Sequence, residues 1–156
     1  MIALSEFELD IVGLGSFVYA MREVAQADGE EHPDELELIN SLLAEGPDLQ
    51  GQTIPERFDA RSLIEEEVKA AFLVVLSLVA VVDGAVQESE RAVIQKYADE
   101  LGLSEHVDGY IRSAALWLLS TFHSVEIFRD ELIDFGEGLG LTRAEIIEHF
   151  DELPSA

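Results

Sequence analysis

Two short acidic motifs with the same spacing are the residues of this chain best suited to chemistry. Each has the pattern D-G-x5-E, and its acidic residues are Asp28 and Glu35 in the first copy and Asp83 and Glu90 in the second. The copies lie 55 residues apart, and the sequences around them align at that offset without a gap. Carboxylate oxygens are ligands that Mg²⁺, Ca²⁺ and Mn²⁺ prefer. These four residues are therefore candidate ligands of a divalent cation.

Each motif is expected to join the end of one helix to the beginning of the next. Asp28 and Asp83 would lie at helix C-termini, where the macrodipole disfavours a carboxylate by about 0.3–1 kcal/mol. Glu35 and Glu90 would lie in the first turn of the following helix, where a negative charge is favoured. The short connection lets each Asp fold toward its Glu. A bound cation would offset the unfavourable position of the Asp residues.

A purely structural explanation of the motif is equally open. Each Asp can form an Asx-turn, each Gly can adopt the left-handed conformation after a helix, and each Glu can interact with the next helix dipole. The pattern also matches only the second half of an EF-hand loop, because the first two ligand positions hold Val24 and Gln26 in one copy and Val79 and Val81 in the other. A cation would therefore need ligands from the other repeat or from water.

Other candidate sites are weaker. Glu31 and His32 lie within the first acidic turn and are secondary metal candidates. His149 has Glu145 and Glu152 near it on one predicted helix, but such residues are usually solvated surface groups. No H-E-x-x-H, G-x-S-x-G, P-loop or dinucleotide-binding motif is present. The sequence therefore predicts no enzyme.

Apolar residues recur at helical spacing, which predicts an all-α, single-domain bundle over residues 1–156. Its parts are a first repeat over about 5–45, a surface loop over 46–61, a second repeat over about 62–101 and C-terminal helices over 104–153. Capping boxes are predicted at Ser5 with Glu8, Ser62 with Glu65, and Thr142 with Glu145. The seven predicted helices cover about 5–28, 33–45, 62–83, 88–101, 104–119, 125–137 and 142–153.

Composition limits the partners. The formal net charge of −24 opposes binding to nucleic acid or to anionic lipid, and favours cations and basic partner proteins. Without cysteine the chain has no thiolate metal site or thiol redox step. The longest apolar run, over residues 70–82, is shorter than the roughly 20 residues of a membrane span, so no membrane insertion is expected. The N-terminus lacks a basic region typical of secretory signals, which predicts a cytoplasmic protein.

Two segments, VAQADGEEHPDELELINSLL (24–43) and LVAVVDGAVQESERAVIQKYADELGLS (78–104), resemble the tellurite-resistance TerB family and the TerB-like domain of some J-domain co-chaperones. The family's Ala-Asp-Gly turn has the form Val-Asp-Gly in the second copy, and the phrases LGLS and LGLT match its later helices. The resemblance implies a duplicated all-helical fold with an acidic surface cluster that holds metal ions, and the family's acidic positions correspond to Asp28, Glu35, Asp83 and Glu90. It also implies a scaffold role in a bacterial stress response with membrane-associated and calcium-binding partners.

Two functional hypotheses follow. The first is a TerB-like acidic module that binds a divalent cation (Ca²⁺, Mg²⁺, Mn²⁺ or Zn²⁺) and acts as a scaffold in a tellurite or chemical stress response. The second is a protein-protein interaction adaptor that binds no metal and whose acidic turns are structural helix caps.

Overall fold

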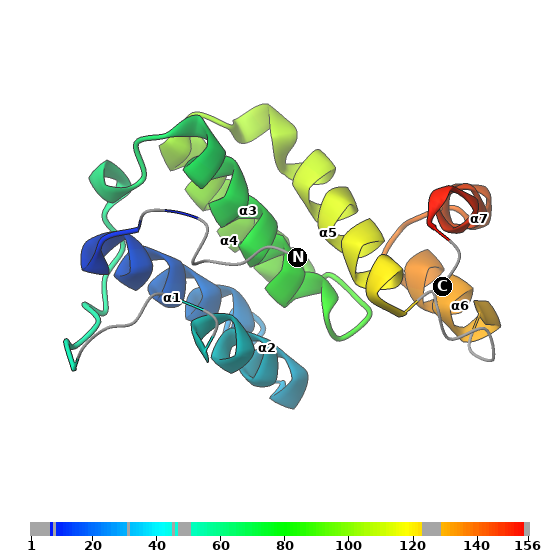
Figure 1. The fold of residues 1–156 in the computed structure, drawn as a ribbon, viewed down its shortest axis with the longest axis horizontal. Helices are drawn as coiled ribbons and strands as arrows, with labels where there is room; N and C mark the ends of the chain where they lie inside the picture. Colours follow the sequence, from blue (N-terminus) through cyan, green and yellow to red (C-terminus); the bar gives the residue numbers. More distant parts are fainter. Residues whose placement is uncertain are drawn as a thin grey trace.

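The described part of the protein contains seven α-helices and no β-strand (Figure 1). The structure, a computed structural model, describes residues 7, 9–30, 32–44, 46, 51–122 and 129–154. The predicted all-α class is confirmed. The helices are α1 (Ile11–Ala25), α2 (Pro33–Ala44), α3 (Glu66–Val81), α4 (Glu88–Leu101), α5 (Val107–Phe122), α6 (Arg129–Gly138) and α7 (Arg143–Glu152), with short 3-10 helices η2 (Ala60–Ser62) and η3 (Ser104–His106).

Helix α3 is the centre of the bundle. Its sequence is apolar on almost every side, and eleven of its sixteen residues are buried. Helices α1, α2, α4 and α5 all pack against it (Figure 1). Phe17 of α1 and Phe72 of α3 are both fully buried, with ring centroids 5.1 Å apart in an edge-to-face arrangement. A helix that is apolar all round is stable in water only when neighbours cover it, which explains this central position.

Helices α6 and α7 pack against the end of α5 and against each other, at one end of the molecule (Figure 1). Gly136 of α6 permits this close approach. A Cβ atom at that position would lie 2.6 Å from Ile146 Cδ1 of α7 and 3.0 Å from Leu119 Cδ1 of α5. The missing side chain therefore allows three helices to meet.

Some predicted helix boundaries are confirmed and others are wrong. Helix α4 covers the predicted residues 88–101, and Thr142 with Glu145 forms the predicted capping box of α7. Helix α1 begins at Ile11 and not near residue 5, because the Asp10 carboxylate caps it by accepting a hydrogen bond from the Gly13 N–H at 2.7 Å. Ser5 and Glu8 lie outside the described residues.

The predicted start of the third helix is also wrong. Ser62 belongs to η2, and its hydroxyl donates to the Asp59 carbonyl at 2.6 Å, so it is not available to cap α3. Helix α3 begins four residues later, at Glu66, after Glu65. Part of the sixth predicted helix, residues 125–128, lies outside the described residues, and α6 begins at Arg129.

The segment before η2 is not simply a surface loop. The ring of Phe58 lies 4.7 Å from that of Tyr97 and 5.7 Å from that of Phe72, centroid to centroid. A Cβ atom at Gly15 of α1 would lie 2.4 Å from the Pro55 carbonyl oxygen, so this segment runs directly over α1. Pro55 and Phe58 thus belong to a packed connection. Of the predicted loop, residues 47–50 lie outside the described part.

Candidate functional site: a buried carboxyl pair between two acidic turns

The two D-G-x5-E turns share the same local contacts at their Asp and Gly residues. Gly29 and Gly84 have φ angles of 88° and 93°, in the left-handed region that favours glycine. In the first turn, Asp28 Oδ1 accepts a hydrogen bond from the Glu30 N–H at 3.0 Å. In the second turn, Asp83 Oδ1 accepts one from the Ala85 N–H at 3.1 Å. Both are Asx-turns, which fix the direction in which the chain leaves the preceding helix.

The two glutamates also play the same local role. Glu35 Oε2 accepts a hydrogen bond from the His32 N–H at 3.1 Å, and Glu90 Oε2 accepts one from the Gln87 N–H at 2.7 Å. Each carboxyl group therefore reaches back over the first turn of its helix and satisfies a backbone donor there. This leaves the second oxygen of each glutamate free of that local contact.

The bundle brings these two glutamates together. Their side chains hydrogen-bond to each other, although they come from different helices, α2 and α4. Both are buried, with 2% of Glu35 and 1% of Glu90 exposed. Two carboxylates in contact cannot both be ionised away from water, so the pair must share a proton or bind a cation.

The surroundings raise the pKa of both glutamates. Burial raises the pKa of Glu90 to about 8, with further increases from the hydrogen bond to Glu35 and from the negative charges of Asp83 and Glu35. The Gln87 N–H acts in the opposite direction. Burial also raises the pKa of Glu35, and the charges of Asp83 and Asp28 add to this increase.

The four predicted ligands are thus brought into one region but do not form a complete cage. Asp28 and Asp83 influence the pair through their charge, while one oxygen of each is used by its own turn. Within the described residues, no three Asp, Glu or His side chains converge tightly enough to form a ready-made metal site. A cation held by the two glutamates fits the chemistry of the donors, which are hard carboxylate oxygens, and any further ligands would come from water or from movement of an Asp side chain.

The secondary candidates are placed elsewhere or not described. His32 Nδ1 lies 3.5 Å from the Asp34 N–H nitrogen, at the first turn of α2, as an imperfect cap. Glu31 lies outside the described residues. His149 is not a solvated surface residue as predicted: its Nε2 lies 2.6 Å from Ser120 Oγ and 3.1 Å from the Leu116 carbonyl oxygen, so it holds α7 against α5.

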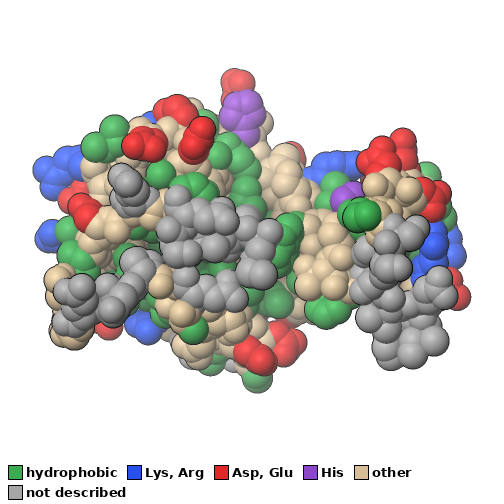
Figure 2. Space-filling view, viewed as in Figure 1, with side chains coloured by type: hydrophobic (Ala, Val, Ile, Leu, Met, Phe, Trp, Pro, Cys, Tyr) green, Lys and Arg blue, Asp and Glu red, His purple; other side chains and the backbone are tan. Residues whose placement is uncertain are grey.

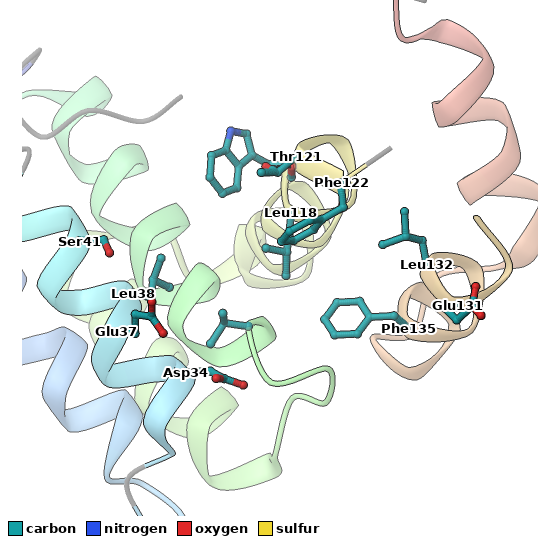
Figure 3. Close-up of a pocket in the computed structure, with 12 residues that line it drawn as sticks. Asp34, Glu37, Leu38, Ser41, Leu118, Thr121, Phe122, Glu131, Leu132 and Phe135 are labelled. Atoms are coloured by element: carbon teal, nitrogen blue, oxygen red, sulfur yellow. Dashed lines mark hydrogen bonds between the residues drawn. The ribbon is translucent and has the colours of Figure 1, made fainter. Parts of the chain in front are cut away.

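A large groove beside the pair was missed by sequence reasoning. Its volume is ≈ 740 Å³, and it lies between α2, the ends of α3 and α5, and α6 (Figure 3). Its apolar lining comes from Val82, Trp117, Leu118 and Phe122 on one part and from Leu38, Leu132 and Phe135 on the other. Its lining residues come from four separate parts of the chain, so no local pattern in the sequence indicates the groove.

The groove adjoins the second acidic turn. Phe135, which lines it, packs directly on that turn, since a Cβ atom at Gly84 would lie 2.9 Å from the Phe135 ring. Asp34 and Val82, also in the lining, directly precede Glu35 and Asp83 in the chain. The carboxyl pair and the groove therefore depend on the same ends of α2 and α3.

Comparisons with protein-family models, with curated proteins and with solved structures gave no significant match. In the described residues, no helix combines the length and the apolar character that crossing a membrane requires.

Proposed function

We propose that this chain is a TerB-like, non-enzymatic acidic module that binds a divalent cation at the Glu35–Glu90 pair, with the charges of Asp28 and Asp83 assisting. The observation that supports it is the pair itself: two buried carboxyl groups in contact, one from each acidic turn, which need a proton or a cation between them. A divalent cation can replace that proton and would also neutralise the surrounding negative charge. Mg²⁺, Ca²⁺ and Mn²⁺ match the oxygen donors better than Zn²⁺ does.

The proposal extends to a scaffold role. The net charge of −24 favours basic partners, and Asp and Glu side chains are spread over the face seen in Figure 2 and not gathered in one patch. The resemblance of the two acidic turns to those of the TerB family supports a tellurite or chemical stress response with basic or membrane-associated partner proteins. The proposed location is the cytoplasm.

The cation hypothesis is tested by thermal unfolding with Ca²⁺, Mg²⁺, Mn²⁺ and Zn²⁺ at matched ionic strength. Matching is needed because any salt screens the self-repulsion of this acidic chain. A ligand that binds only the folded state raises the unfolding midpoint in a saturable way. We expect one or two of these ions to do so in the wild type, and the effect to be lost in Glu35→Gln with Glu90→Gln.

The matched control is Glu37→Gln with Glu88→Gln. These glutamates lie on the same two helices but are exposed, so the control replaces the same number of carboxyl groups without touching the pair. The cation hypothesis is wrong if all four ions act alike, or if the control loses the effect as completely as the test variant.

A second candidate function is an adaptor whose acidic turns only cap helices. One observation favours it: each of the four acidic residues already accepts a hydrogen bond from a backbone N–H of its own turn. On this hypothesis, Asp28→Ala and Asp83→Ala each lower the free energy of unfolding by about 1 kcal/mol, as lost caps do. On the same hypothesis, no divalent ion would change the unfolding midpoint of these variants more than any other ion does.

A further inference from the structure

The groove has two acidic walls and an apolar floor. Helix α2 forms one wall and α6 the opposite one, while the end of α5 and Val82 lie between them (Figure 3). None of the four acidic motif residues lines it. The groove is therefore a separate feature from the carboxyl pair, although it is adjacent to it.

The floor exposes aromatic surface to water. Phe122, the last residue of α5, is 49% exposed, and Trp117, one and a half turns earlier on the same helix, is half-buried. Both side chains lie in the lining. Covering apolar surface is favourable in water, so a partner that fills the groove gains binding energy here.

The rim carries one sign of charge. Asp34 and Glu37 stand on the α2 wall and Glu131 on the α6 wall, and all three are exposed. No Lys or Arg is among the lining residues. The rim therefore attracts a partner with positive charges on both sides of an apolar stripe.

The same charges argue against other occupants. A lipid surface or a nucleic acid presents phosphates, which the acidic rim repels. A second copy of this chain would bring another net charge of −24 to the contact. A groove between two helices is the usual site for an amphipathic helix, whose apolar residues at positions i, i+3, i+4 and i+7 enter it as one row.

We propose that this groove binds an amphipathic helix of a partner protein, with its apolar stripe on Leu118, Phe122 and Phe135 and its Lys or Arg residues facing Asp34, Glu37 and Glu131. This interaction is independent of cation binding, because it uses other residues. It identifies the kind of partner that a scaffold of this charge recruits.

The chain supplies its own reporter for the test. Trp117 is its single tryptophan and lies in the groove, so a tryptophan-free peptide that enters should shift the emission of Trp117 to shorter wavelength. The probe is a synthetic helix of about 18 residues, or five turns, of Leu, Ala and Lys with leucines on one face. Two control peptides have the same composition with leucines scattered, and the same pattern with Glu in place of Lys.

Two protein variants locate the contact. Phe122→Ala removes an exposed ring, and we expect it to weaken binding about fivefold, as truncation of an interface aromatic does. Its control is Ile64→Ala, which shortens an apolar side chain that is 78% exposed and lies outside the groove. Reversing the rim with Glu37→Lys and Glu131→Lys should weaken binding about tenfold at low salt.

The rim variant has a control of equal net charge, Glu100→Lys with Glu105→Lys, at exposed positions of α4 and η3 outside the groove. Support requires that both groove variants weaken binding more than their controls, and that binding weakens as salt rises. Since the rim residues are exposed, this variant keeps the test decisive even if Phe122→Ala affects folding. Equal binding of the scattered or the acidic peptide would overturn the proposal. So would self-association that shifts Trp117 emission without peptide.

Discussion

Glu35 and Glu90, 55 residues apart in the sequence, bring their buried carboxyl groups into contact between α2 and α4. They occupy the same position in two turns of the same local structure, so each turn supplies one carboxyl group to one site. The hydrogen bond within each turn satisfies only one oxygen of each glutamate carboxyl group. The two buried carboxyl groups also need a proton or a cation between them, and they need it only because the two turns meet.

A proton held by the Glu35–Glu90 pair should make the fold less stable as the pH rises. The pKa of Glu90 is about 8 in the folded protein, against an ordinary value of 4.5. Between these values the folded state keeps a proton that the unfolded chain releases, so the free energy of unfolding falls with increasing pH. One proton corresponds to at most about 1.4 kcal/mol per pH unit. Urea denaturation at constant ionic strength measures this slope.

Glu90→Gln isolates the origin of that slope. The amide can still donate a hydrogen bond to Glu35 but cannot ionise. We expect this variant to lose most of the pH dependence above the ordinary pKa of a glutamate, while Glu88→Gln, an exposed neighbour in the same helical turn, keeps it. A slope that survives in Glu90→Gln would show that other groups cause it.

The two aspartates should differ in their effect on the pair. The charge of Asp83 raises the pKa of both glutamates, whereas that of Asp28 acts on Glu35. Asp83→Asn keeps an acceptor for the Asx-turn and removes the charge, so it should lower the pKa of Glu90. Asp28→Asn should leave that pKa nearly unchanged. NMR titration of the Glu90 side-chain carboxyl carbon measures both, and equal shifts would contradict this geometry.

Cation binding, if it replaces the proton, should depend on pH. As the pH rises toward the pKa of about 8 for Glu90, a cation competes with less bound proton, and its affinity increases. Calorimetry in two buffers of different ionisation enthalpy should detect the release of protons. Binding that is independent of both pH and buffer would place the ion away from the pair, on the general acidic surface.

Two glycines provide a matched test of the second turn. Gly29 and Gly84 have nearly equal positive φ angles, so alanine at either position pays a similar backbone penalty of about 1–2 kcal/mol. A Cβ atom at Gly29 meets no atom within 4 Å, whereas one at Gly84 would lie 2.9 Å from the Phe135 ring. Gly84→Ala should therefore lower the free energy of unfolding by about 1–3 kcal/mol more than Gly29→Ala does. Chemical denaturation compares the two, and equal losses would mean that α6 moves aside without cost.

The sequence predicted helix boundaries correctly where only one capping or turn motif lies near the start of a helix. The boundaries of α4 and the cap of α7 were predicted because a motif directly precedes one amphipathic pattern. The predicted start of α1 was wrong because the sequence offers two capping residues near this helix, Ser5 and Asp10. The sequence alone does not show which of the two caps the helix. Ser62 was misassigned because its hydroxyl finds a better partner in the turn formed with Asp59.

By itself, the sequence determined the helical class, the acidic character and the identity of both D-G-x5-E turns, because apolar period, charge and turn chemistry are local properties. The tertiary structure decided that Glu35 meets Glu90 out of contact with water, and that Phe122 and Phe135 lie in one groove beside an acidic rim. These contacts depend on how α2, α4, α5 and α6 pack around α3, and packing joins residues that no local pattern relates. The raised pKa of Glu90 has the same origin, since only burial beside a second carboxyl group produces it.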